Sequence, residues 1–217
     1  MEAVRGSYII LHIRLGAIKN FLEHTDAEAG VEIQSVFEKY HAGEYEDIDD
    51  FDNALFYPME RQEMAARTVF YELNALSESE LQRSAHVPWL ESEKHSGPKA
   101  LDWHNMTLNS IRSLKRVNDL PFKDILKLIE NKYKIRVKDL EEADTFFQVR
   151  EMVNSFKHRE GYIDFRKQEL KDIDFVACYK ADIEQAYQAI DKTYTFITAL
   201  WKATNREPSP TSGKVDI

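Results

Sequence analysis

Apolar side chains recur at every third or fourth position along most of this chain, and that spacing is typical of amphipathic α-helices. Only the short stretch 134–137 hints at the alternation of apolar and polar positions that marks a β-strand. The helical spacing predicts six or seven helices, at approximately residues 4–24, 26–43, 58–76, 101–118, a short segment from 121, 145–161 and 183–201.

Residues with helix-end chemistry set the predicted boundaries in the first half of the chain. Asp26 is a predicted N-cap, because a carboxylate can accept a hydrogen bond from an amide of the first turn. Gly43 is predicted to end that helix, since glycine tolerates the left-handed conformation. Pro58 fits a first turn, where its missing N–H costs no hydrogen bond. The segments 44–52 and 83–100 are predicted loops, and a loop as long as the second is either functional or mobile.

These elements predict an all-α fold, an antiparallel bundle of six or seven helices. No composition break divides the sequence, so residues 1–206 are predicted to form a single domain. Residues 207–217 have the Pro- and Ser-containing composition of a disordered C-terminal tail.

Composition indicates the cellular compartment in which the protein is expected. The longest apolar run is too short to span a membrane, and the N-terminus has no secretory signal pattern. One cysteine excludes an internal disulfide and a cysteine-based zinc site. A soluble cytoplasmic protein without a membrane partner is therefore expected.

The charge is unevenly distributed along the sequence. The net charge of −9 argues against non-specific nucleic-acid binding by the whole chain. Residues 1–60 carry 4 Lys and Arg against 13 Asp and Glu, whereas residues 112–138 carry nine basic residues against three acids. This pattern is compatible with one cationic face, or with two complementary faces within the fold or a dimer.

The predicted helix 145–161 carries the most informative polar residues. Arg150, Asn154 and His158 are four residues apart, so they form one slanting stripe on a helix. Apolar residues lie on the other side of the same helix and can face a core: Val149, Met152, Val153 and Phe156. The stripe therefore points toward solvent, a cleft or a partner subunit.

These residue types suit the cleavage of a phosphodiester. An arginine fork matches two phosphate oxygens, and a histidine can transfer a proton near neutral pH. Asn154 can orient either group or bond a sugar hydroxyl. The neighbouring Lys157 and Arg159 add positive charge, and Lys115 and Arg116 of the basic segment are further predicted RNA contacts. The alternative interpretation is an ordinary solvated or interface face.

The run Arg150-x3-Asn154-x2-Lys157-His158-x2-Gly161 resembles the signature helix of the HEPN superfamily, the higher-eukaryote and prokaryote nucleotide-binding domain. The stretch 70–80, with its Tyr-Glu-Leu-Asn-Ala-Leu, is similar to a helix of uncharacterised bacterial members. The resemblance covers residues 55–204. In one respect the sequence departs from the family motif, because seven residues separate Arg150 from His158 where the family has four to six.

The resemblance implies an all-α bundle that forms a homodimer, with an arginine and a histidine of each subunit meeting at the dimer cleft. Many members are metal-independent RNA endonucleases of phage-defence or toxin–antitoxin systems. Arg150 and His158 would take the catalytic roles, with Asn154 beside them. RNA is then the expected substrate, and an antitoxin or another defence-system protein the expected partner. The altered spacing leaves open a non-catalytic helical module that binds a protein, RNA or a nucleotide.

No cofactor or metal is expected from the sequence. Glu38-x-x-His41 has the spacing of a helical di-iron ligand pair, but the chain contains no second such pair. It also lacks a phosphate-cradling glycine loop and a nucleophile elbow.

Overall fold

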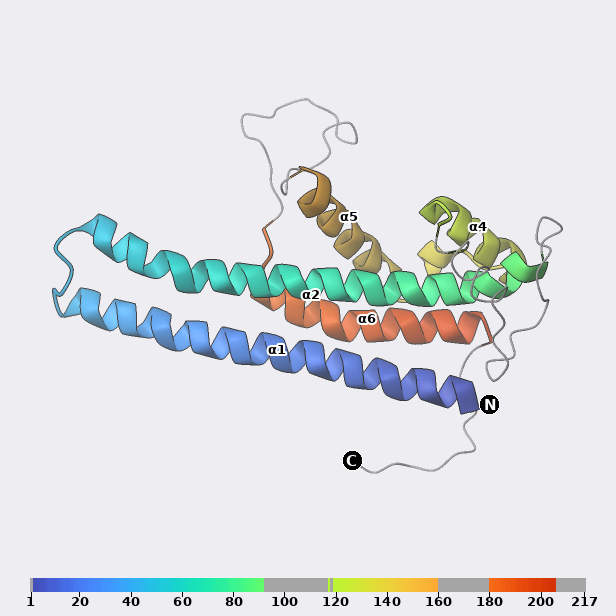
Figure 1. Ribbon diagram of the computed structural model, residues 1–217, viewed down its shortest axis with the longest axis horizontal. Coiled ribbons are helices and arrows are strands. Elements are labelled where there is room, and N and C mark those ends of the chain that lie inside the picture. Colours follow the sequence, from blue (N-terminus) through green and yellow to red (C-terminus); the bar gives the residue numbers. More distant parts are fainter. Residues whose placement is uncertain (1, 92–116, 118, 160–179, 206–217) are drawn as a thin grey trace. The chain divides into compact units, whose positions relative to one another are not determined.

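The computed structural model describes residues 2–91, 117, 119–159 and 180–205, and within these ranges the fold is all-helical without a strand, as predicted (Figure 1). The described residues form five α-helices and one 3-10 helix: α1 Glu2–His41, α2 Ile48–Glu91, α4 Phe122–Tyr133, η1 Val137–Asp139, α5 Ala143–Arg159 and α6 Ile183–Ala203. The predicted helix 101–118 and the tail 207–217 lie outside the described residues, apart from residue 117.

Helix α1 is one continuous element, so the predicted helix start at Asp26 is wrong. No proline interrupts residues 2–41, and Asp26 continues the helix while its Oδ1 accepts a hydrogen bond from Gln62 Nε2 at 2.7 Å. The predicted end is confirmed. The chain leaves the helix at His41, and Gly43 has a φ of 74° in the left-handed region.

Helix α2 begins ten residues before Pro58, so the predicted loop 44–52 shrinks to residues 42–47. The Asp47 carboxylate caps the new start, because its Oδ1 accepts a hydrogen bond from the Asp50 amide at 2.9 Å. Pro58 is buried inside the helix. Figure 1 shows α2 bending in its N-terminal part, and a proline within a helix is the usual cause of such a bend.

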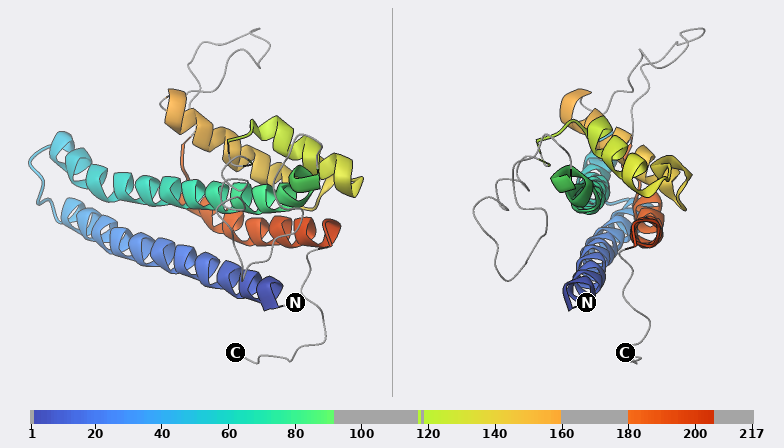
Figure 2. Two further views of the ribbon diagram at one scale, coloured as in Figure 1. Left: turned by 45° about the vertical axis from the view of Figure 1, so that its right-hand side comes forward. Right: turned by 90° about the vertical axis from the view of Figure 1, so that its right-hand side faces the viewer.

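The predicted loop 83–100 is wrong for its first nine residues. Helix α2 continues to Glu91, with Ala85 and His86 buried. The rest of this predicted loop lies outside the described residues. Figures 1 and 2 show residues 14–41 of α1 and 48–74 of α2 side by side, as the two arms of an antiparallel hairpin.

The remaining helices follow the sequence more closely. Helix α4 starts directly after Pro121, and Lys134, in the left-handed region with φ 56°, ends it. No strand forms at 134–137, where a turn residue and two residues without regular structure lead into η1, and the Val137 amide donates to Glu130 Oε1 at 3.0 Å. Helix α6 matches its predicted range, and α5 starts two residues before the predicted position. Gly161, the predicted end of that helix, lies outside the described residues.

The contacts divide the chain into two compact units. The first comprises residues 1–13, 75–144 and 193–217, and the second comprises residues 14–74 and 145–192. The core of the second unit draws on four helices through Leu22, Ala66, Phe70, Val153 and Ile190. None of the described helices combines the length and the apolarity needed to cross a bilayer.

The first unit contains a carboxylate that bonds two helices. Glu80 of α2 is 3% exposed, and its Oε2 accepts a hydrogen bond from Trp201 Nε1 of α6 at 2.8 Å. Its other oxygen accepts from Arg83 at 2.6 Å. A second polar contact joins α1 to α6, where the hydroxyls of Tyr8 and Tyr194 lie 2.7 Å apart.

Replacing Trp201 by Phe should lower the free energy of unfolding by about 1.5–3 kcal/mol, since a buried hydrogen bond to a charged group is lost. Urea denaturation measures this change. Glu80→Gln keeps an oxygen acceptor for the indole, so it should cost less than Trp201→Phe. Equal stability of Trp201→Phe and the wild type would show that the bond contributes nothing.

The Tyr8–Tyr194 contact predicts a pH dependence above neutrality. Burial, followed by the hydrogen bond with Tyr8, raises the pKa of the Tyr194 hydroxyl to about 12. An unfolded tyrosine titrates near pH 10, so the folded state retains a proton that the unfolded state loses. Stability from Tyr194 is therefore complete below about pH 10 and is lost as the pH rises to about 12. In alkaline denaturation, the Tyr194→Phe variant should lack this part of the loss of stability with rising pH.

Candidate functional site

Helix α5 divides into a buried and an accessible side much as the sequence predicts. Val149, Met152 and Val153 are buried, and Ser155 is completely buried beside them. On the accessible side, exposure rises toward the end of the helix. Arg150 and Asn154 are half-buried, whereas Lys157 and His158 are exposed.

The three predicted catalytic residues share a helix but do not meet within one chain. His158 follows Arg150 by eight positions, which corresponds to about 12 Å along a helix axis. Asn154 lies midway between them. The Nε atom of Arg150 is shielded from solvent, while the His158 ring is accessible. One subunit therefore presents the arginine and the histidine two turns apart, and a single phosphate could contact both only if a long side chain or a second subunit closed the gap.

Two cation–aromatic contacts join α5 to α2. In one the cation belongs to α2, and in the other it belongs to α5. The Arg67 guanidinium of α2 lies over the Phe156 ring of α5, with its carbon 4.9 Å from the ring centroid. The Lys157 ammonium of α5 lies over the Tyr71 ring of α2 at 5.3 Å. Each helix thus supplies one cation and one ring, which fixes the position of Lys157 beside His158.

The side of α2 that carries these two contacts includes polar residues. Arg67, Tyr71 and Asn74 are spaced by four and three residues, so they lie on one side of the helix. Arg67 also donates a hydrogen bond to Glu63 at 2.7 Å, which offsets part of its charge. Asn74 is 5% exposed, and its buried Oδ1 has no hydrogen-bond partner among the described residues. A buried amide oxygen of this kind is unusual in a folded protein.

The sequence did not predict these partners of α5. Tyr71 and Asn74 belong to the stretch 70–80 that carries the second family resemblance, but nothing in the spacing indicates that Tyr71 contacts Lys157. Arg67 lies outside both motifs. Pairing between helices depends on tertiary packing, which the period of one helix does not specify.

Three of the predicted RNA contacts cannot be placed. Lys115 and Arg116 lie outside the described residues, and Arg159 ends α5 without a described side chain. Farther along the basic segment, the described cations of residues 121–138 are all exposed: Lys123, Lys127, Lys132, Lys134, Arg136 and Lys138. No group of three or more His, Cys, Asp or Glu side chains in the described ranges is arranged to hold a metal ion, and Glu38 accepts a hydrogen bond from Gln34.

Comparison of the chain with protein-family models, with curated proteins and with solved structures found no match. The structural evidence for a function therefore consists of the α5 stripe and the α2 face that α5 contacts.

The two cation–aromatic contacts should be separately measurable by double-mutant cycles. For Arg67→Met with Phe156→Leu, and for Lys157→Met with Tyr71→Leu, we expect coupling energies of about 0.5–1 kcal/mol in urea denaturation, as for cation–π pairs at partly exposed sites. A coupling near zero in both matched cycles would mean that the rings and cations are neighbours without attraction.

Proposed function

We propose that this protein is a HEPN-like, metal-independent RNA endonuclease that acts as a homodimer. The observation that carries the proposal is the accessible side of α5, where the exposed His158 and Lys157 follow Arg150 and Asn154 on one helix stripe. In this proposal Arg150 binds the scissile phosphate and His158 transfers a proton or stabilises the developing charge. Asn154 orients the reacting groups, and Lys157 and Arg159 attract the RNA backbone.

The dimer is required by the distance between the two catalytic residues. About 12 Å of helix separates Arg150 from His158 in one chain. Two α5 helices packed in opposite directions would place the arginine of one copy beside the histidine of the other. A composite site of this kind needs no shortening of the spacing, so the seven intervening residues are compatible with it.

The contact between Lys157 and Tyr71 also supports the proposal. It brings together the two stretches that separately resemble the HEPN superfamily, one on α2 and one on α5. A tyrosine ring beside accessible cations is, in addition, a surface on which an unpaired RNA base can stack.

A second candidate is a non-catalytic HEPN-like module that binds a protein, RNA or a nucleotide. The half-buried Arg150, with its shielded Nε atom, favours this candidate. An arginine in this position stabilises packing and has less of its guanidinium available for a phosphate. The biological setting of either candidate, which we propose to be a cytoplasmic bacterial phage-defence or toxin–antitoxin system with a protein partner, follows from the resemblance alone.

RNA cleavage in the presence of EDTA tests the proposal directly. Purified protein should cleave single-stranded RNA without added metal, and His158→Ala and Arg150→Ala should each lower the rate by about 10²-fold or more, since general acid–base catalysis contributes factors of that size. Cleavage products resolved on denaturing gels measure the rate.

Matched controls separate catalysis from folding and charge. His24 is an exposed histidine of α1 that pairs with Glu28, and Arg61 is an arginine of α2 that pairs with Glu32. His24→Ala and Arg61→Ala should retain wild-type cleavage. Failure of the wild type to cleave any RNA, combined with RNA binding that is lost in Lys157→Ala, would establish the non-catalytic candidate instead.

A further inference from the structure

The distal end of the α1–α2 hairpin, defined here as residues 26–64, has almost no core of its own. None of the side chains from residue 30 to residue 50 is buried, and beyond that point Phe51 and Pro58 are the first that are. Phe51 contacts Phe37, Tyr40 and Tyr45 at ring-centroid distances from 4.3 to 6.0 Å. A two-helix segment with so little burial is marginally stable by itself, so contact with another surface would stabilise it.

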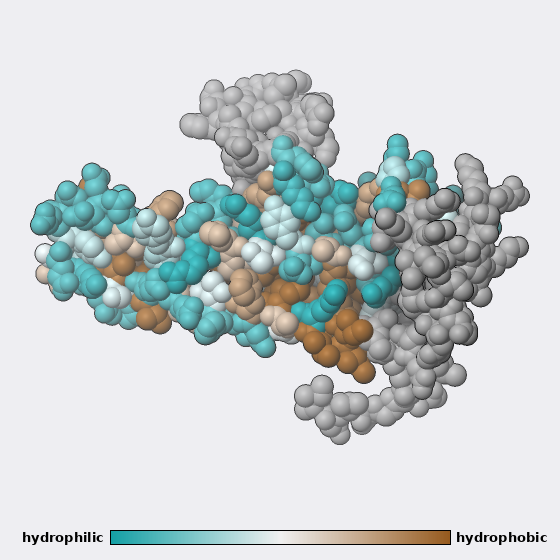
Figure 3. Space-filling model, in the orientation of Figure 1, coloured by the Kyte–Doolittle hydropathy of each residue, from teal (hydrophilic) through white to brown (hydrophobic). Residues whose placement is uncertain are grey.

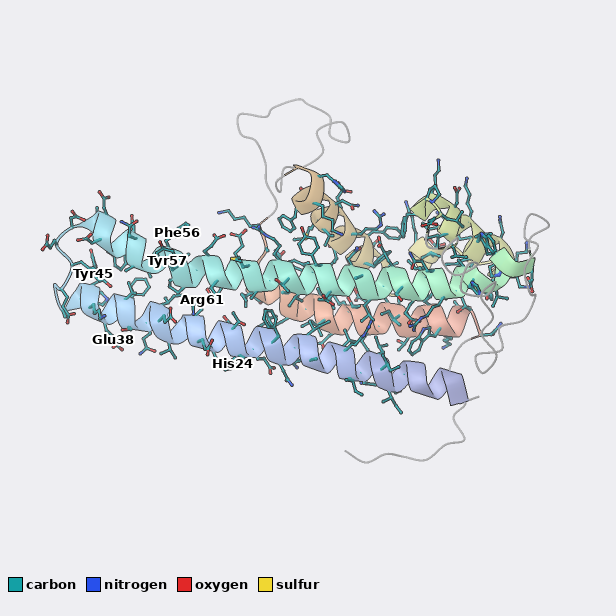
Figure 4. The ribbon with its side chains drawn as sticks, viewed as in Figure 1. His24, Glu38, Tyr45, Phe56, Tyr57 and Arg61 are labelled. Carbon is teal, nitrogen blue, oxygen red and sulfur yellow. The ribbon has the colours of Figure 1, made fainter. Side chains whose placement is uncertain are left out.

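The outward face of α2 within this hairpin end exposes large apolar side chains. Five of them are 56–74% exposed: Ile48, Phe56, Tyr57, Met59 and Met64. At about 100° per residue, they occupy the half of the helix roughly opposite the buried Phe51 and Pro58. Figure 4 shows Phe56 on the side of α2 away from α1, with Arg61 between the two helices. Large apolar side chains on one exposed side of a helix can be covered by a partner protein.

Acidic residues alternate with these apolar residues. Asp49 and Asp52 are exposed and Glu60 is half-buried on the same half of α2. The whole hairpin end carries 12 Asp and Glu against Lys39 and Arg61, a balance of −10. Arg61 is already held by Glu32 through two hydrogen bonds, of 2.6 and 2.9 Å. Figure 3 shows this end as a mainly hydrophilic surface with scattered apolar positions.

This charge restricts what can cover the hairpin end. Two hairpin ends cannot pair with each other through this face, because like charges would be brought together. Nucleic acid is repelled for the same reason. A cationic protein surface is attracted, and its lysines and arginines can also contact the faces of Phe56 and Tyr57.

The chain itself contains such a surface. Residues 121–138, called here the cationic segment, carry six Lys and Arg against Asp124 and Glu130, a balance of +4, and all six cations are exposed. Three of them form ion pairs with carboxylates of the same unit: Lys127 with Asp124, Lys132 with Glu91 and Arg136 with Asp139. Adding the two carboxylates outside the segment, Glu91 and Asp139, lowers the balance from +4 to +2, so the segment remains positive.

We propose that the hairpin end of one copy of this protein docks on the cationic segment of a second copy. Opposite charges bring the two surfaces together, and the apolar residues of α2 are covered in the contact. A reciprocal contact closes a dimer, whereas a one-way contact extends a chain of copies. This surface is distinct from the accessible side of α5, so the proposal does not depend on the proposed nuclease activity.

A charge-swap experiment on the full chain tests the contact. Sedimentation velocity should show that the wild type self-associates in about 0.05 M salt, with at least a tenfold weaker apparent affinity in about 0.5 M salt, because screening shortens the reach of the charges. Reversing the hairpin end (Asp49→Lys, Asp52→Lys, Glu60→Lys) should abolish this salt-dependent association. Reversing the cationic segment (Lys123→Glu, Lys127→Glu, Lys134→Glu) should also abolish it.

Mixing the two variants is the decisive measurement. The reversed hairpin end of one variant is complementary in charge to the reversed cationic segment of the other. An equimolar mixture should therefore regain the association that neither variant shows alone. As a control, Lys19→Glu with Glu184→Lys changes exposed charges elsewhere and should leave association unchanged. If charge reversal impairs folding, as circular dichroism would reveal, Phe56→Ser with Tyr57→Ser tests the same face without altering charge and should weaken association at least tenfold.

Three results would overturn the proposal. The wild type could be monomeric at every concentration in low salt. The mixture of reversed variants could fail to associate although both are folded. Association could persist in both reversed variants and be lost in His158→Ala or Lys157→Ala, which would assign self-association to α5. A monomeric wild type that binds a synthetic lysine-rich peptide through Phe56 and Tyr57 would assign the hairpin end to a different cationic partner.

Discussion

The length of α1 and α2 is the constraint on which the other features depend. Helices of 40 and 44 residues rise about 60 and 66 Å at 1.5 Å per residue. The other described helices have 12 to 21 residues, so none can accompany the hairpin over its full length. Where α5 and α6 contribute, the hairpin has a core that includes Leu22 and Phe70. Where α5 and α6 do not contribute, no side chain of residues 30–50 is buried, and this part of α1 and α2 is left exposed.

Charge separates the functions that these surfaces can serve. The hairpin end is strongly anionic, so it cannot attract an RNA backbone, whereas α4 with η1 is cationic and the end of α5 exposes Lys157 beside His158. The overall charge of −9 is therefore a poor guide to either surface. The local balance of charge determines what each surface attracts, because exposed charges farther apart than about 8 Å are largely screened at physiological salt.

Sequence periodicity predicted the elements that end at strong local signals. Pro121 and Gly43 mark real helix boundaries, and the apolar stripe of α6 reappears in the buried Ala186, Ile190 and Ile197. It failed where a polar residue or a proline has a tertiary role, since Asp26 bonds Gln62 across the hairpin and Pro58 is buried within α2. For the candidate site, the two faces of α5 could be predicted from spacing. The rings and cations that join α5 to α2 could not, because a single helix period contains no information about its partner.

The contact of Lys157 with Tyr71 decides how a cation on α5 could act on a phosphate. A ring face attracts the ammonium electrostatically and uses none of its three N–H donors in a strong hydrogen bond. Lys157 can therefore stay over the ring and still donate to an anion on its open side, with less side-chain entropy to lose than a free lysine. Arg67 differs, because Glu63 already accepts one of its N–H groups. Of the two cations at this junction, Lys157 is thus the one whose N–H donors the ring leaves available, and in the proposed nuclease we expect an RNA phosphate beside it at the end of α5.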